Sequence, residues 1–335
     1  MLKRFKSIFL CTLLFSGSLF ANFGPGFDGE CSNSCCSSWK IDAEFLYFLP
    51  TFDDTYFVLR SPVTTGFPNG ERLNNDFDFR PGFRVGAAYE MCGCCDGELQ
   101  AYYTRLSSNR TRTVTGSFLW ATVGRAAFTS NFENYTGSAS SDLDFLYQRV
   151  DGLYSHRLWC NNCVRFEGSF GLEYTHIRLT EQYEFINGGV VGLVDQRTKT
   201  CGIGPQFGFN FDYLICQTSC WCPGALSVAA CSSGSLIASR NQLYNRNTLT
   251  GVPILDVSDE RTWRIIPALH ARIGLNYAAC FSCFGASIEL GYEFTSYLRA
   301  ISRSTFPDDV GDSLCLTNYY NFDVQGLYVA LNVSF

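Results

Sequence analysis

Apolar and polar residues alternate with a period of two along much of the chain. Residues 164–179 show the pattern most clearly, with Phe170 and Leu172 at one set of alternate positions and Glu167 and Glu173 at the other. Because successive side chains of a β-strand point to opposite faces, this pattern predicts a strand with one apolar and one polar face. The same alternation recurs at 202–215, 264–279 and 284–294.

The lengths of these runs favour a membrane barrel over a soluble sandwich. A transmembrane strand needs about 9 to 11 residues at a tilt near 45°, whereas ordinary strands average about 5 to 6 residues. In lipid, every backbone N–H and C=O needs a partner, and strands achieve this only by closing into a barrel. The sequence therefore predicts an all-β, transmembrane, antiparallel β-barrel whose polar face lines the lumen. About ten strands are expected, within a range of eight to twelve, at 38–49, 80–91, 98–107, 143–158, 164–180, 199–215, 224–238, 263–279, 284–300 and 320–335.

The connections between these runs are of two alternating kinds. Short connections carry cysteines and lie at 91–97, 159–163, 216–224 and 280–283. Long connections are rich in Asn, Thr, Ser and Gly and lie at 50–79, 108–142, 181–198, 239–262 and 301–319. Short periplasmic turns and long extracellular loops are typical of outer-membrane barrels. The segment 108–142 is also long enough to contain a further hairpin or a plug helix.

The two ends of the chain support the same interpretation. Residues 1–21 join a basic stretch to a short apolar run and a small residue, Ala21, as a secretory signal peptide does. Residues 22–37 then form a cysteine-rich periplasmic segment, and 38–335 form the barrel. The last strand ends in an aromatic residue, Phe335, which we interpret as the signal for outer-membrane barrel assembly. Aromatic residues make up 16% of the chain, as expected where rings cover a lipid-facing surface.

The polar positions of the predicted strands supply the candidate lumen-lining residues. Their charges are of both signs, so we expect weak ion selectivity. Ten strands make a barrel whose interior side chains can nearly fill it, and a filled barrel conducts nothing; more strands or a homo-oligomer would relieve this conflict. The candidates are Arg84, Glu90, Glu98, Gln100, Arg149, Asp151, Arg157, Arg165, Glu167, Glu173, Gln206, Asn210, Asp212, Arg264, His270, Arg272, Glu289 and Glu293.

Most of the 17 cysteines lie in the short turns or just before the first strand. In an oxidising compartment, disulfides are the default expectation for such cysteines, although the sequence does not determine their connectivity. They can pair within a turn, between turns, or with another envelope protein. The candidates are Cys31, Cys35, Cys36, Cys92, Cys94, Cys95, Cys160, Cys163, Cys216, Cys220, Cys222, Cys280 and Cys283.

Several segments together resemble one known family. In chain order they are 76–90, 97–106, 142–159, 164–179, 202–213 and 327–335, and the most specific is "PGFRVG" at 81–86. They resemble the pore-forming major outer membrane protein family first described in Legionella and abundant in chlamydia-like bacteria. The resemblance implies an outer-membrane porin, and the cysteine-bearing turns resemble the chlamydial use of a disulfide-linked envelope.

Other kinds of chemistry find little support in the sequence. The chain contains no Gly-x-Ser-x-Gly elbow, phosphate loop or His-Glu-x-x-His motif. The two Cys-x-x-Cys pairs, Cys160 with Cys163 and Cys280 with Cys283, match zinc or dithiol spacing, but a structural zinc site needs four ligands. The net charge of −6 makes nucleic acid a poor partner. We expect no cofactor or metal.

The sequence thus predicts a porin in the bacterial outer membrane that lets small hydrophilic solutes and ions diffuse passively. Its expected partners are membrane lipid, such solutes and disulfide-linked envelope proteins. The main alternative is a structural or adhesive barrel that is cross-linked through its periplasmic turns and transports little. A third class is a soluble, disulfide-rich exported β domain. An outer-membrane lipase or protease is the enzymatic alternative; we expect no enzyme.

Overall fold

The computed structural model describes residues 38–53, 55–61, 70–91, 97–124, 126–161, 163–218, 224–281, 284–305 and 316–335. The predicted signal peptide (1–21) and cysteine-rich segment (22–37) lie outside the described residues. No helix in the described part of the chain is long and apolar enough to cross a membrane.

Ten long strands close into an antiparallel ring, as the alternation predicts. Around the ring, their order is β5-β4-β1-β12-β11-β10-β9-β8-β7-β6, and pairing of β5 with β6 closes it. The strands are β1 (Ser38–Phe52), β4 (Arg80–Met91), β5 (Gly97–Ala121), β6 (Tyr135–Cys160), β7 (Val164–Asn187), β8 (Val190–Thr218), β9 (Gly224–Leu249), β10 (Val252–Cys280), β11 (Gly285–Thr305) and β12 (Leu316–Ser334).

The outward-facing side chains form an apolar belt around one half of the barrel. On β8, large apolar residues occupy the outward positions from Ile203 to Ile215, and Phe207 is 64% exposed. At the end of β12, Phe335 is also exposed, and its backbone pairs with that of Trp39. The part of each strand that carries this belt is long enough to cross a bilayer.

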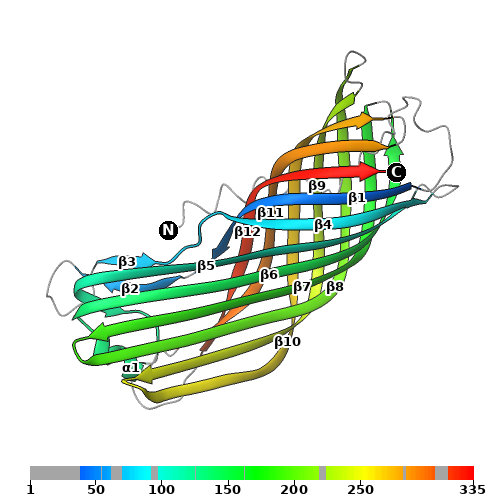
Figure 1. Cartoon of the computed structure of the whole chain (residues 1–335). Coiled ribbons are helices and arrows are strands. Elements are labelled where there is room, and N and C mark those ends of the chain that lie inside the picture. The colour runs from blue at the N-terminus through cyan, green and yellow to red at the C-terminus, as the bar shows by residue number, and fades with distance from the viewer. Residues whose placement is uncertain are drawn as a thin grey trace.

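Six strands continue far beyond the belt. Strands β5 to β10 have 24 to 29 residues each, and their far ends form a curved sheet that projects to one side of the ring (Figure 1). We call this projecting sheet the extension. The predicted strand ends were therefore wrong here, because 181–198, 239–262 and most of 108–142 are strand rather than loop.

Tight turns explain why so little of these segments is loop. Strands β7 and β8 are joined by Gly188 and Gly189, and β9 and β10 by Thr250 and Gly251. Thr250 and Gly251 have φ of 46° and 83°, as a two-residue hairpin of type I′ requires. Strands β7 and β8 keep one register to the tip, whereas the pairing of β9 with β10 shifts register between Pro253 and Leu255 and between Asp259 and Thr262.

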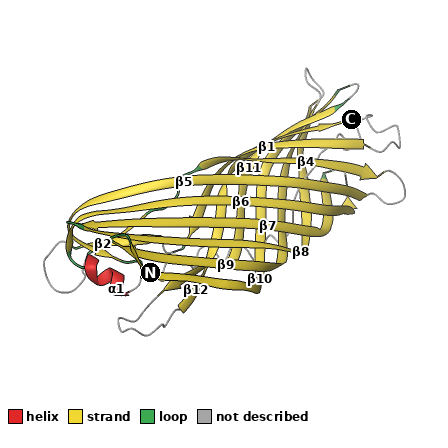
Figure 2. Cartoon of the chain, turned by 60° about the horizontal axis from the view of Figure 1, so that its bottom comes forward, coloured by secondary structure: helices red, strands yellow, loops and turns green. Residues whose placement is uncertain are grey.

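The remaining elements cover the inner face of the extension (Figure 2). They are β2 (Tyr56–Arg60), β3 (Glu71–Asn74), α1 (Ala126–Thr129) and the 3-10 turn Ser130–Phe132. Strand β2 pairs with β3 and with the far end of β5. Phe57, Phe132 and Phe185 are fully buried between these elements and the sheet. The extension therefore has an apolar core of its own.

Candidate functional site

The lumen inside the apolar belt is the candidate functional site. Most of the predicted lumen-lining side chains point inward and are buried: Arg84, Glu98, Gln100, Arg149, Asp151, Glu167, Glu173, Gln206, Asn210, Asp212, His270, Arg272, Glu289 and Glu293. They come from seven strands that lie far apart in the sequence. The structure brings several of them together into two groups of ion pairs, which we call the charged layer.

The first group is built around two arginines and the carboxylate that bridges them. Arg84 donates to Glu44 at 2.8 Å and to Glu293 at 2.6 Å. Arg272 donates to the other oxygen of Glu44 and to Glu289, both at 3.1 Å. The group joins β1, β4, β10 and β11 across the lumen. Since each guanidinium has two carboxylate partners, its burial is compensated by charge and by hydrogen bonds.

The second group is built around Glu173 of β7. This carboxylate accepts hydrogen bonds from His270 Nε2 at 2.9 Å and from Tyr297 Oη and Ser235 Oγ, both at 2.6 Å. Arg149 Nη1 lies 2.8 Å from His270 Nδ1. A guanidinium can only donate, so His270 Nδ1 accepts and the imidazole proton is on Nε2, which donates to Glu173.

Charged residues also line the end of the lumen near the cysteine-bearing turns. Lys40 Nζ lies 2.6 Å from Glu98 and 3.3 Å from Glu90, which is partly exposed. Arg165, also partly exposed, pairs with Glu167, whose other oxygen accepts from Asn210 Nδ2 at 3.3 Å. This end of the lumen is thus polar and open to water at its edge.

Two further predicted residues do not join the charged layer. Arg157 is partly exposed near the end of β6. Arg264 lies towards the extension end of β10, where its guanidinium sits 3.6 Å from the ring centroid of Tyr319 and donates to the carbonyl of Arg299 at 2.8 Å.

The sequence reasoning missed the lumen residues of β1. Lys40, Asp42 and Glu44 are buried and point inward, and Glu44 bridges the two arginines of the first group. They alternate with Ile41 and Phe45 on the outer face, so the period-two pattern that found the other candidates would have found these as well.

An aromatic layer lies next to the charged layer, on the side of the extension. The rings of Phe52, Phe145 and Tyr147 surround that of Phe322, with centroid separations of 5.0 to 5.5 Å. Tyr147 Oη lies 3.0 Å from Tyr297 Oη, which links this layer to the charged layer. These five rings are at most 5% exposed. The lumen is filled with side chains at this level, as the small size of a ten-stranded barrel allows.

The described part of the structure contains none of the predicted disulfides. The thiols of Cys160, Cys163 and Cys216 are exposed at the turn end of the barrel and form no disulfide in this structure. The turn itself is held by Asn161 Oδ1, which accepts from the backbone N–H of Cys163 at 3.0 Å and of Val164 at 2.7 Å. Outside the described residues lie Cys31, Cys35, Cys36, Cys92, Cys94, Cys95, Cys220, Cys222, Cys283 and the side chain of Cys280.

A closed ring with an apolar belt outside and ion pairs inside defines an outer-membrane β-barrel. The chain belongs to the family described as Legionella pneumophila major outer membrane protein precursor, whose family model matches residues 33–335. The protein therefore resides in the outer membrane. In such barrels the longer segments outside the bilayer are on the extracellular side, so we infer that the extension is extracellular.

Other comparisons give more distant likenesses. A search of curated proteins finds no match. Among solved structures, the outer membrane protease OmpT from Escherichia coli is similar at 8% identity, with 89% of this chain and 96% of that chain covered and a TM-score of 0.40. A Pseudomonas aeruginosa FadL homologue is similar at 7% identity, with 89% and 90% covered and a TM-score of 0.27. The Pseudomonas putida toluene transporter TodX is similar at 7% identity, with 95% of each chain covered and a TM-score of 0.27.

Proposed function

We propose that the protein is a passive channel of the porin type for small hydrophilic solutes and ions, and that the conformation described is its closed state. The observation that carries the proposal is the polar lumen inside the belt. Asp212 Oδ1, Asn210 Oδ1 and both side-chain polar atoms of Asn276 are buried there without a hydrogen-bond partner in the described protein. Buried polar atoms need partners, so we infer that water occupies this part of the lumen.

The aromatic layer is the barrier to passage in this proposal. Its rings are buried and pack around Phe322, and in this proposal a hydrated ion passes only when they move aside. Ten strands form a barrel close to the size that side chains alone can fill. We therefore expect small and infrequent conductance steps. The charged layer has both signs of charge, which favours weak selectivity between anions and cations.

Conductance of the refolded protein in a planar bilayer tests the proposal. The Phe322→Ala variant removes the ring at the centre of the aromatic layer, and we expect larger or more frequent openings than in the wild-type protein. Phe170→Ala is the matched control, because Phe170 is on the lipid-facing side of the belt. If the correctly folded wild-type and Phe322→Ala proteins are both silent, the channel proposal fails.

The filled lumen favours a second candidate, a structural or adhesive barrel with little transport. In this alternative, the exposed thiols of Cys160, Cys163 and Cys216 link the barrel to other copies or to other envelope proteins. Electrophoresis with and without reductant, combined with the conductance measurement, separates the two candidates. Reducible multimers of a silent barrel support the structural role, whereas conductance supports the channel.

We propose no enzymatic activity for the barrel. The buried acids Glu173 and Glu293 are held in ion pairs and are not arranged around an open substrate site. Hydrolysis of a peptide or an ester by the folded protein, at a rate that Glu173→Gln reduces, would contradict this assignment.

A further inference from the structure

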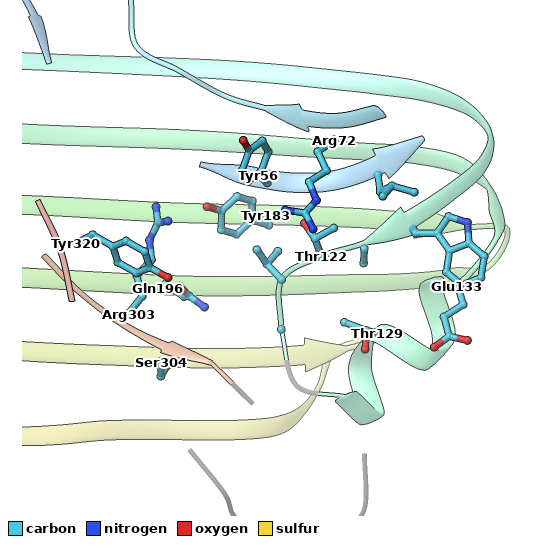
Figure 3. Close-up of a pocket in the computed structure, with 15 residues that line it drawn as sticks. Tyr56, Arg72, Thr122, Thr129, Glu133, Tyr183, Gln196, Arg303, Ser304 and Tyr320 are labelled. Atoms are coloured by element: carbon cyan, nitrogen blue, oxygen red, sulfur yellow. The ribbon is translucent and has the colours of Figure 1, made fainter. Parts of the chain in front are cut away.

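The extracellular extension contains a pocket that the channel proposal does not use. Its volume is about 520 Å³, within the range of roughly 300 to 1,000 Å³ that is usual for small-molecule sites. It lies between the β2–β3 hairpin and the inner wall of the extension, where the ends of β11 and β12 also reach it (Figure 3). Its lining includes Tyr56, Arg72, Tyr183, Gln196, Arg303 and Tyr320.

The hairpin that forms one wall is fixed to the barrel by buried hydrogen bonds. Asn75, which follows β3 and is fully buried, donates from Nδ2 to the carbonyl and to the hydroxyl of Ser141, both at 3.0 Å. On the other strand of the hairpin, the carbonyl of Phe57 accepts from the backbone N–H of Thr122 at 3.2 Å. The wall is therefore in place before a ligand arrives, which reduces the ordering cost of binding.

The two arginines of the pocket differ in their partners. Arg303 is buried, and its guanidinium donates to both oxygens of Glu181, so its charge is compensated within the protein. Arg72 is exposed, and its guanidinium lies 5.6 Å from the ring centroid of Tyr56. Among the described residues, no carboxylate forms a salt bridge with it. In Figure 3, Arg72 points between Tyr183 and Thr122 into the middle of the pocket.

The pocket therefore offers one uncompensated guanidinium beside several aromatic rings. A guanidinium binds a carboxylate through two parallel N–H···O bonds, and the tyrosine rings offer flat surfaces against which a ring can pack. The acidic lining residue, Glu133, is at the far end of the pocket in Figure 3. The centre of the pocket thus favours an anion.

We propose that this pocket binds a small organic carboxylate that carries a ring, with the carboxylate on Arg72 and the ring against the tyrosines. The site is extracellular and goes beyond the channel function, because its occupancy does not require the lumen to open. The shared chemistry is a carboxylate on a ring, which an acidic sugar and an aromatic acid both have.

Calorimetric titration of the full-length, refolded protein in detergent tests the proposal. The probes are benzoate and glucuronate, with benzyl alcohol and glucose as their neutral counterparts. We expect at least one acid to bind more tightly than its neutral counterpart. We expect Arg72→Gln to weaken that binding at least about tenfold, which corresponds to about 1.4 kcal/mol, and Arg72→Glu to abolish it.

The matched control is Arg246→Gln, which removes the same charge from an exposed site elsewhere on the extension, where Arg246 lies 4.0 Å from Asp256. Heat-dependent migration of each variant shows whether it folds. The proposal is overturned if neither acid binds, if the neutral counterparts bind equally well, or if the folded Arg72→Gln protein binds like the wild-type protein. Equal losses in Arg72→Gln and Arg246→Gln would show a general charge effect and would also overturn it. Conductance plays no part in this test, so it is independent of the channel proposal.

Discussion

The two halves of strand β7 have the same period and opposite chemistry. Within the belt, Leu172 faces outward and Glu173 faces the lumen; in the extension, Glu184 faces outward and Phe185 faces inward. The pairing of β7 with β8 keeps one register through both halves, so the backbone does not cause the change. The surroundings cause the change, because lipid surrounds the belt and water surrounds the extension. The apolar face of a strand therefore points outward where lipid surrounds the barrel and inward where water surrounds it.

The interior of each half is stabilised by different interactions. In the belt, ion pairs and hydrogen bonds join the strands across the lumen, and every buried charge depends on its partners. In the extension, Phe128, Phe132 and Phe185 pack with centroid separations of 5.1 to 5.7 Å. Removal of an inward carboxylate from the belt should therefore have a much larger effect than removal of an outward carboxylate from the extension.

The largest expected effect is that of Glu173→Ala. This change leaves His270, Tyr297 and Ser235 without the carboxylate that accepts their hydrogen bonds, and Arg149 keeps Asp151 as its carboxylate partner. Removing one member of a buried ion-pair group costs about 3–5 kcal/mol, so we expect the free energy of unfolding to fall by that amount. Denaturant unfolding of the refolded protein in lipid vesicles measures it.

Glu184→Ala is the matched control for that change. Glu184 lies on the same strand, on the outer, water-exposed face of the extension. Exposed substitutions usually change stability by no more than about 0.5 kcal/mol. Similar losses in the two variants would mean that the lumen of the belt is not the low-dielectric interior described above.

A charge added to the outer face should again destabilise the belt more than the extension. Leu172→Arg places a cation in the middle of the apolar belt, where the cost near the bilayer midplane is about 2–4 kcal/mol. Gln182→Arg makes a similar change on the outer face of the extension, where we expect almost none. Unfolding in vesicles of both variants measures the difference, and equal stability would place the bilayer elsewhere on the barrel.

The belt was more predictable from the sequence than the extension. Ten alternating runs with apolar outward faces follow from the requirement for a closed barrel in lipid, and the structure has them. Beyond the belt the alternation continues with its chemistry inverted, as Tyr183 and Phe185 turn inward, so the Thr- and Asn-rich stretches read as loops. Contacts across the lumen could not be predicted from the sequence. Arg84 and Glu293, for example, are 209 residues apart, and only the closed ring brings them together.

The smallest expected effect concerns the hairpins that make the extension so long. Gly251 has a φ of 83°, whereas its counterpart Gly189 does not have a positive φ, and neither has an atom within 4 Å of the position of an added Cβ. Gly251→Ala should therefore cost about 1 kcal/mol through backbone strain alone, and Gly189→Ala should cost almost nothing. We expect faster amide hydrogen exchange near the tip of β9 and β10 in the first variant, by a factor of about 5, and unchanged exchange at the tip of β7 and β8 in the second. Equal exchange at both tips would show that steric space, rather than the left-handed backbone conformation, determines which residue each turn accepts.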